Sequence, residues 1–96
     1  MKYVVMSVRL GELNIELPFV FPEVCVHSTM AFGFDRALRQ QYRGALVRPV
    51  SAGFISSTAI EEGCHGDSET LQLKSRGEVD DKLINMMDYG SIHVHN

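Results

Sequence analysis

The chain begins with two segments in which alternate positions are apolar. Residues 3–10 carry one such set (Val4, Met6, Val8 and Leu10), and residues 13–21 carry another (Leu13, Ile15, Leu17, Phe19 and Phe21). A period of two places each set on one face of a β-strand. Gly11 and Glu12 lie between them and suit a type II′ turn, which has glycine at its first central position. The pattern predicts a β-hairpin, and Pro18, which has no N–H, places its second strand at an edge or a bend.

The spacing then becomes helical over residues 29–43. Ser28 is a suitable N-cap, and Gly44 stands where a left-handed residue ends many helices. We expect Gly33 to let this helix pack closely on the sheet. The expected inward stripe consists of Met30, Phe34, Ala37, Leu38 and Gln41.

A strand over 46–55, a short strand over 70–73 and a second helix complete the pattern. The small residues Ser51, Ala52 and Gly53 indicate that another part of the protein, or another subunit, packs closely there. Ser75 and Glu78 match a capping box for the second helix. Its expected apolar stripe is Val79, Leu83, Met86 and Met87, and Gly90 is expected to end it.

The predicted fold class is therefore α+β. The element order ββαββα gives a two-layer sandwich, with a largely antiparallel four-stranded sheet and two helices. We expect residues 1–90 to form a single domain and residues 91–96 to be a C-terminal tail or an added edge strand. The other face of the sheet would be bare or covered by a partner, so a domain of this size favours a homo-oligomer.

Composition and charge narrow the range of functions. Of the 96 residues, 45% are hydrophobic and 22% charged, as in ordinary globular domains, and the formal net charge is −3. Nucleic acid is an unlikely partner, because phosphate neutralisation needs a basic surface. Without a long apolar run or a signal-peptide pattern, we expect a cytoplasmic protein with no membrane partner, in which Cys25 and Cys64 are reduced.

Residues 63–69, GCHGDSE, concentrate chemistry-bearing side chains. Cys64 and His65 point to opposite sides of an extended chain, so they do not form a nucleophile–base pair with each other. The simpler interpretation is a turn in which Gly63 and Gly66 have positive φ, Ser68 and Asp67 bond the backbone, and Cys64 packs as an apolar residue. We assign no catalytic residues.

Metal and anion binding remain open as alternatives. A zinc ion could be held by Cys25, His27, Cys64 and His65, although the paired spacing of structural zinc sites is absent. The Ser75–Arg76 junction at the start of the second helix could hold an anion or a nucleotide. Solvated surfaces are the simpler interpretation of the remaining charged groups, which include Arg36, Arg39, Arg43, Arg48, Glu61, Glu62 and the Asp80–Asp81 pair. His93 and His95 are assigned to a mobile tail.

The stretch PVSAGFI followed by CHGDSETLQLKSR resembles short uncharacterised proteins of bacteriophages and prophages. In those proteins an SAGF strand precedes a C-x-G-x-S-E-x-L-x-L-x-S-R stretch, and the likeness covers about half of this chain. The resemblance implies a bacterial or viral cytosolic setting and an accessory role. Apart from the zinc alternative, we expect no cofactor. It directs attention to Ser68, Glu69 and Arg76 as a possible binding surface.

From the sequence we therefore expect a small non-enzymatic interaction module that binds a protein partner or another copy of itself. Its expected binding residues are His65, Asp67, Ser68, Glu69, Ser75 and Arg76. The alternative is a small protein that holds an anion, a nucleotide or zinc near Cys64, His65, Ser68, Ser75 and Arg76.

Overall fold

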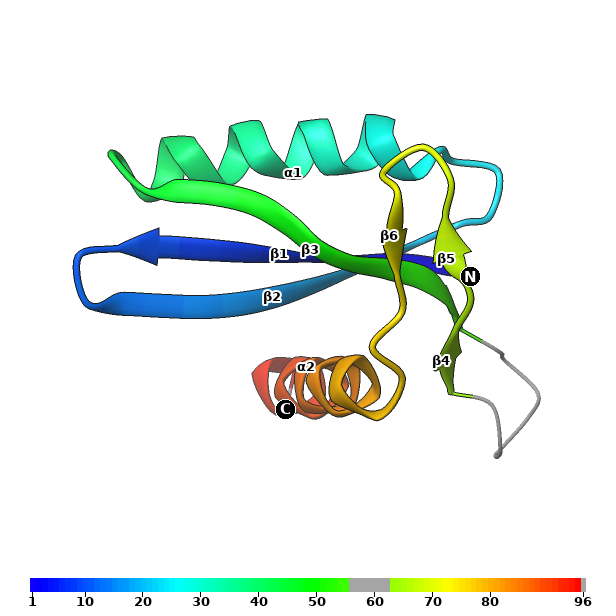
Figure 1. The fold of residues 1–96 in the computed structure, drawn as a ribbon. Coiled ribbons are helices and arrows are strands. Elements are labelled where there is room, and N and C mark those ends of the chain that lie inside the picture. Colours follow the sequence, from blue (N-terminus) through cyan, green and yellow to red (C-terminus); the bar gives the residue numbers. More distant parts are fainter. Residues whose placement is uncertain (56–62, 96) are drawn as a thin grey trace.

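The structure is a computed structural model that describes residues 1–55 and 63–95, with side chains described for 1–55 and 63–86. Its elements are β1 (Lys2–Leu10), β2 (Leu13–Phe21), α1 (His27–Gln41), β3 (Leu46–Ile55), β4 (Cys64–His65), β5 (Asp67–Ser68), β6 (Leu73–Lys74) and α2 (Glu78–His95). The sheet is antiparallel with the order β2-β1-β3-β4, and β5 and β6 form a separate two-stranded ribbon. The predicted α+β class, with a four-stranded antiparallel sheet and two helices, is confirmed (Figure 1).

The two helices pack on opposite faces of the sheet (Figure 1). Alternation along β1 produces this arrangement, because Val4, Met6 and Val8 enter one apolar cluster together with Leu38 of α1. Tyr3 and Val5 point to the other face, where they meet Cys64 and Ile84. The face that we expected to be bare thus carries α2.

The register of the sheet explains both prolines within its strands. Gly11 has φ of 60°, as the predicted type II′ turn requires, and the pair Leu10–Leu13 closes the turn. Hydrogen-bonded and non-hydrogen-bonded pairs then alternate along the hairpin, and Pro18, opposite Val5, falls in a non-hydrogen-bonded pair. Its missing N–H therefore faces the outer edge of β2. The same alternation turns Pro49 toward the outer edge of β3, so each edge lacks a donor that strand addition would use.

Several predicted details of α1 are wrong. The helix begins at His27, with Val26 at the N-cap position and no side-chain cap, so Ser28 does not cap it. Ala37 and Gln41 are exposed, whereas Ala31 and Leu38 are buried. Gly33 is exposed and a Cβ there would meet nothing within 4 Å, so it does not mediate close packing.

The region that connects β3 to α2 also differs from the prediction. The fourth strand of the sheet is Cys64–His65 and not residues 70–73, because Thr70, Leu71 and Gln72 form the turn between β5 and β6. Gly63 and Gly66 have the expected positive φ, 35° and 80°.

Helix α2 likewise differs in its register and its end. It does not end at Gly90 but continues to His95, so residues 91–95 are helical and are not an edge strand. The expected stripe is also misplaced, since Val79 and Met86 are 51% and 70% exposed whereas Ile84 is buried.

Gly53 in β3 is contacted closely by the segment that connects β3 to α2. A Cβ at Gly53 would lie 2.4 Å from the carbonyl oxygen of His65 and 3.2 Å from the Cβ of Ser75. Only glycine has no atom there, so this residue permits β4 and the start of α2 to approach β3. The close approach predicted around residues 51–53 is thus made by the same chain.

Candidate functional site

Among the side chains of α2 that the structure describes, Asp80 is the most buried ionisable one, with no exposed surface. We expected it to lie on the solvent side of the helix, and this was wrong. Glycine at 53 brings the start of α2 against the sheet, and Asp80 then points at Tyr3 of β1 and Ser51 of β3, which are also fully buried. A carboxylate in such a position needs hydrogen-bond donors to replace water.

Asp80 accepts four hydrogen bonds. Its Oδ2 accepts from the Tyr3 hydroxyl at 2.6 Å and from the Arg76 amide at 2.9 Å. Its Oδ1 accepts from Ser51 Oγ at 2.9 Å and from Arg76 Nε at 2.8 Å. Tyr3 has one proton, which serves Asp80, so its 2.6 Å contact with Ser75 Oγ is best donated by Ser75. Both carboxylate oxygens are fully used.

The pKa values follow from this arrangement. Burial, and then the hydrogen bond to Asp80, raise the pKa of Tyr3 well above its ordinary value. Burial alone would raise the pKa of Asp80, but the donors Tyr3, Ser51 and Arg76 outweigh it and hold that pKa below the ordinary value. At neutral pH the pair is therefore a neutral phenol that donates to a carboxylate.

Arg76 extends this network to the edge strand. In addition to Asp80, its Nη1 and Nη2 donate to the two carboxylate oxygens of Glu16 in β2, at 3.2 and 2.9 Å. Ser75 accepts from the Gly77 amide at 3.0 Å, and Asp80, not Glu78, reaches back to the chain before the helix. The predicted capping box is thus replaced, and we name the set Tyr3, Glu16, Ser51, Ser75, Arg76 and Asp80 the Asp80 network.

Cys64 behaves as an apolar residue. It is 6% exposed, and burial, followed by repulsion from Asp81 and Asp80, raises the pKa of its thiol to about 11. The thiol is therefore neutral at physiological pH, whereas a nucleophilic cysteine needs a thiolate. Both Cys64 and Cys25 are free thiols.

The four zinc candidates do not converge. Cys64 packs on the α2 face of the sheet, while His27 is buried on the other face between the rings of Phe21 and Phe54. Among residues 1–55 and 63–86, no three His, Cys, Asp or Glu side chains are placed to share a metal ion. Glu61, Glu62 and the side chains of His93 and His95 lie outside the described residues.

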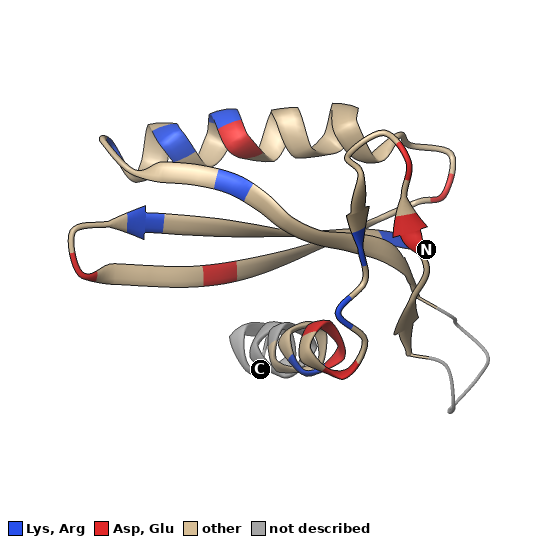
Figure 2. Ribbon diagram, viewed as in Figure 1, with Lys and Arg blue, Asp and Glu red and all other residues tan. Residues whose placement is uncertain are grey.

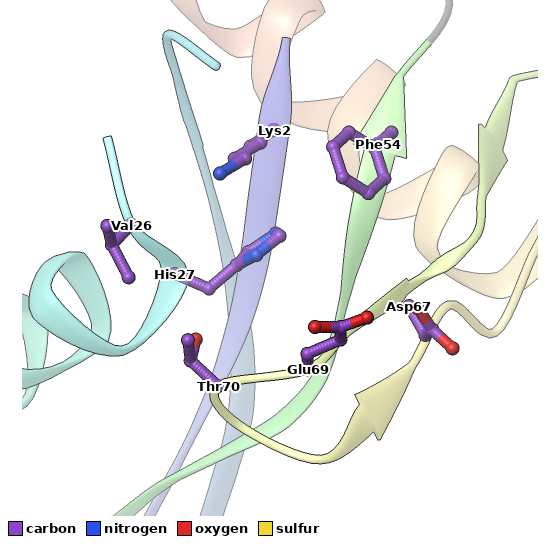
Figure 3. A pocket seen from close by; sticks show the side chains of 7 residues that line it. All are labelled: Lys2, Val26, His27, Phe54, Asp67, Glu69 and Thr70. Carbon is purple, nitrogen blue, oxygen red and sulfur yellow. The ribbon is translucent and has the colours of Figure 1, made fainter. Parts of the chain in front are cut away.

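A pocket of about 370 Å³ opens where the beginning of β1, the end of β3, the beginning of α1 and the β5–β6 ribbon meet. It is lined by Lys2, Val26, His27, Phe54, Asp67, Glu69 and Thr70 (Figure 3). Its wall on the ribbon side carries the acidic residues, whereas Lys2 comes from β1 on the far side. We call it the ribbon pocket.

Hydrogen bonds fix the walls of the ribbon pocket. His27 Nε2 donates to the carbonyl oxygen of Gly53 at 3.0 Å, and the Ser28 amide donates to Thr70 Oγ1 at 3.2 Å. Lys2 Nζ donates to the Cys25 carbonyl at 2.9 Å and lies 5.9 Å from the centre of the Phe54 ring. Within the described part of the chain, no ion pair joins Lys2 to Asp67 or Glu69. Lys2 and the two acidic residues thus line one pocket without an ion pair between them.

The structure does not bring the six predicted binding residues into one site. Asp67 and Glu69 line the ribbon pocket, whereas Ser68 is buried, and its hydroxyl accepts from the Leu71 amide. Ser75 and Arg76 belong to the Asp80 network, and His65 is exposed beside Phe54, with 6.4 Å between the ring centres. The binding role of all six residues stays a prediction.

Sequence reasoning did not identify Lys2, Phe54 and Thr70 as pocket residues. Lys2 and Phe54 follow the strand pattern, which gives no signal of a site, and only the cross-strand pair Lys2–Phe54 brings them together. The sequence analysis did identify His27 as a candidate residue, but as a zinc ligand and not as part of a pocket.

No family model, no curated protein and no solved structure matches this chain. None of the described helices has the length and apolar character needed to cross a membrane.

Proposed function

We propose that this protein is a small interaction module that binds a segment of a partner protein in the ribbon pocket. The observation that carries the proposal is the separation of charge in that pocket, with Lys2 on one wall and Asp67 and Glu69 on the other. An extended peptide offers both complements. A basic side chain would pair with the two carboxylates, and a main-chain carbonyl would accept from Lys2.

The apolar surface around the pocket supports a protein partner. Val26 lines the pocket and is 45% exposed, and Val24, two residues earlier, is 87% exposed. The Phe54 ring adds a flat surface on which the aliphatic part of a lysine or arginine can pack. Exposed apolar side chains beside a polar pocket are typical of protein-binding sites.

The biological setting is part of the same proposal. The resemblance to phage and prophage proteins supports an accessory role in the cytoplasm of a bacterial or phage-infected cell. Self-association is the second form of the proposal, supported by the exposed apolar residues of α1 and α2, such as Phe32 at 64% and Met86 at 70%. Both forms use binding and require no cofactor.

Amide NMR titrations with capped amino acids test the pocket. N-acetyl-arginine amide should shift the signals of residues 67–70, Phe54 and His27, with a Kd on the order of 1 mM or weaker, whereas N-acetyl-glutamate amide should not. The double variant Asp67→Asn/Glu69→Gln should lose these shifts. Glu78→Gln, which removes an exposed carboxylate outside the pocket, should retain them. Equal shifts from both fragments, or shifts that survive the double substitution, would overturn the proposal.

A further inference from the structure

A second pocket, of about 270 Å³, lies at the other end of β1 and β3. It is lined by Ser7, Arg9, Arg39, Leu46, Val47 and Arg48, so half of its lining residues are arginines. They come from three elements, β1, α1 and β3. We call it the arginine pocket.

Register and hydrogen bonds hold the arginine pocket together. Ser7 lies opposite Arg48, and Arg9 lies opposite Leu46, so all four side chains start from one face of the sheet. This is the α2 face, because the alternation that turns Val8 toward α1 turns Ser7 and Arg9 away from it. Arg39 comes from α1, on the other face, and reaches the pocket at the outer edge of β3. Its Nη2 donates to the Val47 carbonyl at 3.0 Å, and its Nε donates to Asp35. These two hydrogen bonds hold the Arg39 side chain in place. A guanidinium has five N–H donors, so three remain for a ligand.

The local charge is positive although the protein carries a formal net charge of −3. None of the described residues that line the pocket is acidic. Asp35 is paired with Arg39, and Glu16, which faces Ser7 across the hairpin, is held by Arg76. Figure 2 shows Lys and Arg gathered on the second half of α1, the first half of β3 and the end of β1. The residues are Arg9, Arg36, Arg39, Arg43 and Arg48, which are five of the nine Lys and Arg residues.

From this arrangement we propose that the arginine pocket binds the phosphate group of a small phosphorylated ligand. Guanidinium groups match phosphate oxygens with paired N–H donors, and three of them can share one dianion. The size of the pocket suits a single phosphate with a small substituent rather than a length of nucleic-acid backbone. This site lies apart from the ribbon pocket and does not depend on the proposed function.

Titration with inorganic phosphate and then adenosine monophosphate, followed by amide and arginine Nε–H NMR signals, tests the proposal. Both probes should shift residues 7–9 and 46–48 and the Arg39 Nε–H, and the shifts should saturate at constant ionic strength. Arg9→Gln and Arg48→Gln, both at exposed positions, should each weaken binding about fivefold to tenfold. Arg36→Gln is the matched control, because Arg36 is exposed on α1, lies over the Phe32 ring and does not line the pocket.

The outcomes separate a site from a diffuse basic surface. Saturable binding that depends on Arg9 and Arg48 but not on Arg36 supports the phosphate pocket. An equal loss of affinity in all three variants, or shifts that sodium chloride reproduces at the same ionic strength, overturns it. Binding of a short single-stranded oligonucleotide without any binding of phosphate or adenosine monophosphate also overturns it, in favour of a nucleic-acid surface. Because Asp67→Asn/Glu69→Gln leaves the arginine pocket intact, failure of one site is distinguishable from failure of the other.

Discussion

Asp80 links the start of α2 to the sheet through buried hydrogen bonds. Asp80 is fully buried. It accepts four hydrogen bonds, and their donors lie in β1, β3 and the segment that leads into α2. A buried carboxylate with four hydrogen-bond donors is stable because these hydrogen bonds offset the free-energy cost of removing its hydration shell. Among the described residues, Asp80 is the one carboxylate that the Tyr3 hydroxyl, the Ser51 hydroxyl and the Arg76 amide reach, so removal of its charge leaves these buried donors poorly paired.

Asp80→Asn should therefore destabilise the protein by about 3 kcal/mol, because the new amide group places donors against the donors of Tyr3 and Arg76. In a domain of this size the loss should lower Tm by roughly 15 °C. Chemical denaturation of the variant and the parent measures the difference. Glu78→Gln is the control, since Glu78 is exposed in the same first turn of α2 and should change stability by less than about 0.5 kcal/mol. Similar losses in both variants would contradict the role assigned to Asp80.

The pH dependence of stability has a definite sign. The pKa of Asp80 is lower in the folded protein than in the unfolded chain, where it is about 3.9. Its ionised form therefore stabilises the fold above about pH 4, and this contribution is lost as the pH falls through the folded pKa. The free energy of unfolding should decrease below about pH 4, and in Asp80→Asn this part of the decrease should be absent. Denaturation curves at a series of pH values check this, and parallel curves for the two proteins would contradict it.

At the scale of elements, the junction between β3 and α2 decides the arrangement. Gly53 lets the His65 carbonyl and Ser75 lie against β3, and this contact positions both the β5–β6 ribbon and the start of α2. The ribbon provides Asp67, Glu69 and Thr70 to the ribbon pocket, and the start of α2 provides Asp80. One glycine thus links the pocket to the Asp80 network.

Gly53→Ala should destabilise the protein by about 2 kcal/mol or more, because the backbone atoms of His65 cannot move away from the new Cβ without disturbing β4. Gly33→Ala is the opposite case, since a Cβ there meets nothing and Gly33 lies within a helix. It should stabilise by up to about 1 kcal/mol. Thermal denaturation of the two variants should shift Tm in opposite directions, and a shift in the same direction would refute this account of the junction.

At the scale of the molecule, charge is segregated along the sheet. The arginines gather where β1 ends and β3 begins, while Asp67 and Glu69 lie with Lys2 at the opposite ends of the same strands (Figure 2). A protein with a formal net charge of −3 can therefore present two surfaces of different chemistry. Pro18 in β2 and Pro49 in β3 each lack an N–H at the outer edge of the strand, which disfavours strand addition there. We therefore expect partners to use the pockets and helix surfaces instead.

The sequence alone determined the hairpin, the third strand and the existence of both helices. In the hairpin, the period of two, the Gly11 turn and the placement of Pro18 all favour one register, because local sterics and side-chain alternation act over a few residues. The positive φ of Gly63 and Gly66 was predictable for the same reason.

The tertiary structure decided which face of α2 is buried and which polar residues meet. An Asp-Asp pair in a helix is ordinarily solvated, and nothing local distinguishes Asp80 from Asp81. Asp80 is buried only because Tyr3 and Ser51, far away in sequence, supply donors at the place where Gly53 admits the helix. Likewise, Lys2 and Phe54 form one pocket because β1 pairs with β3, and such long-range pairing leaves no trace in the periodicity of either segment.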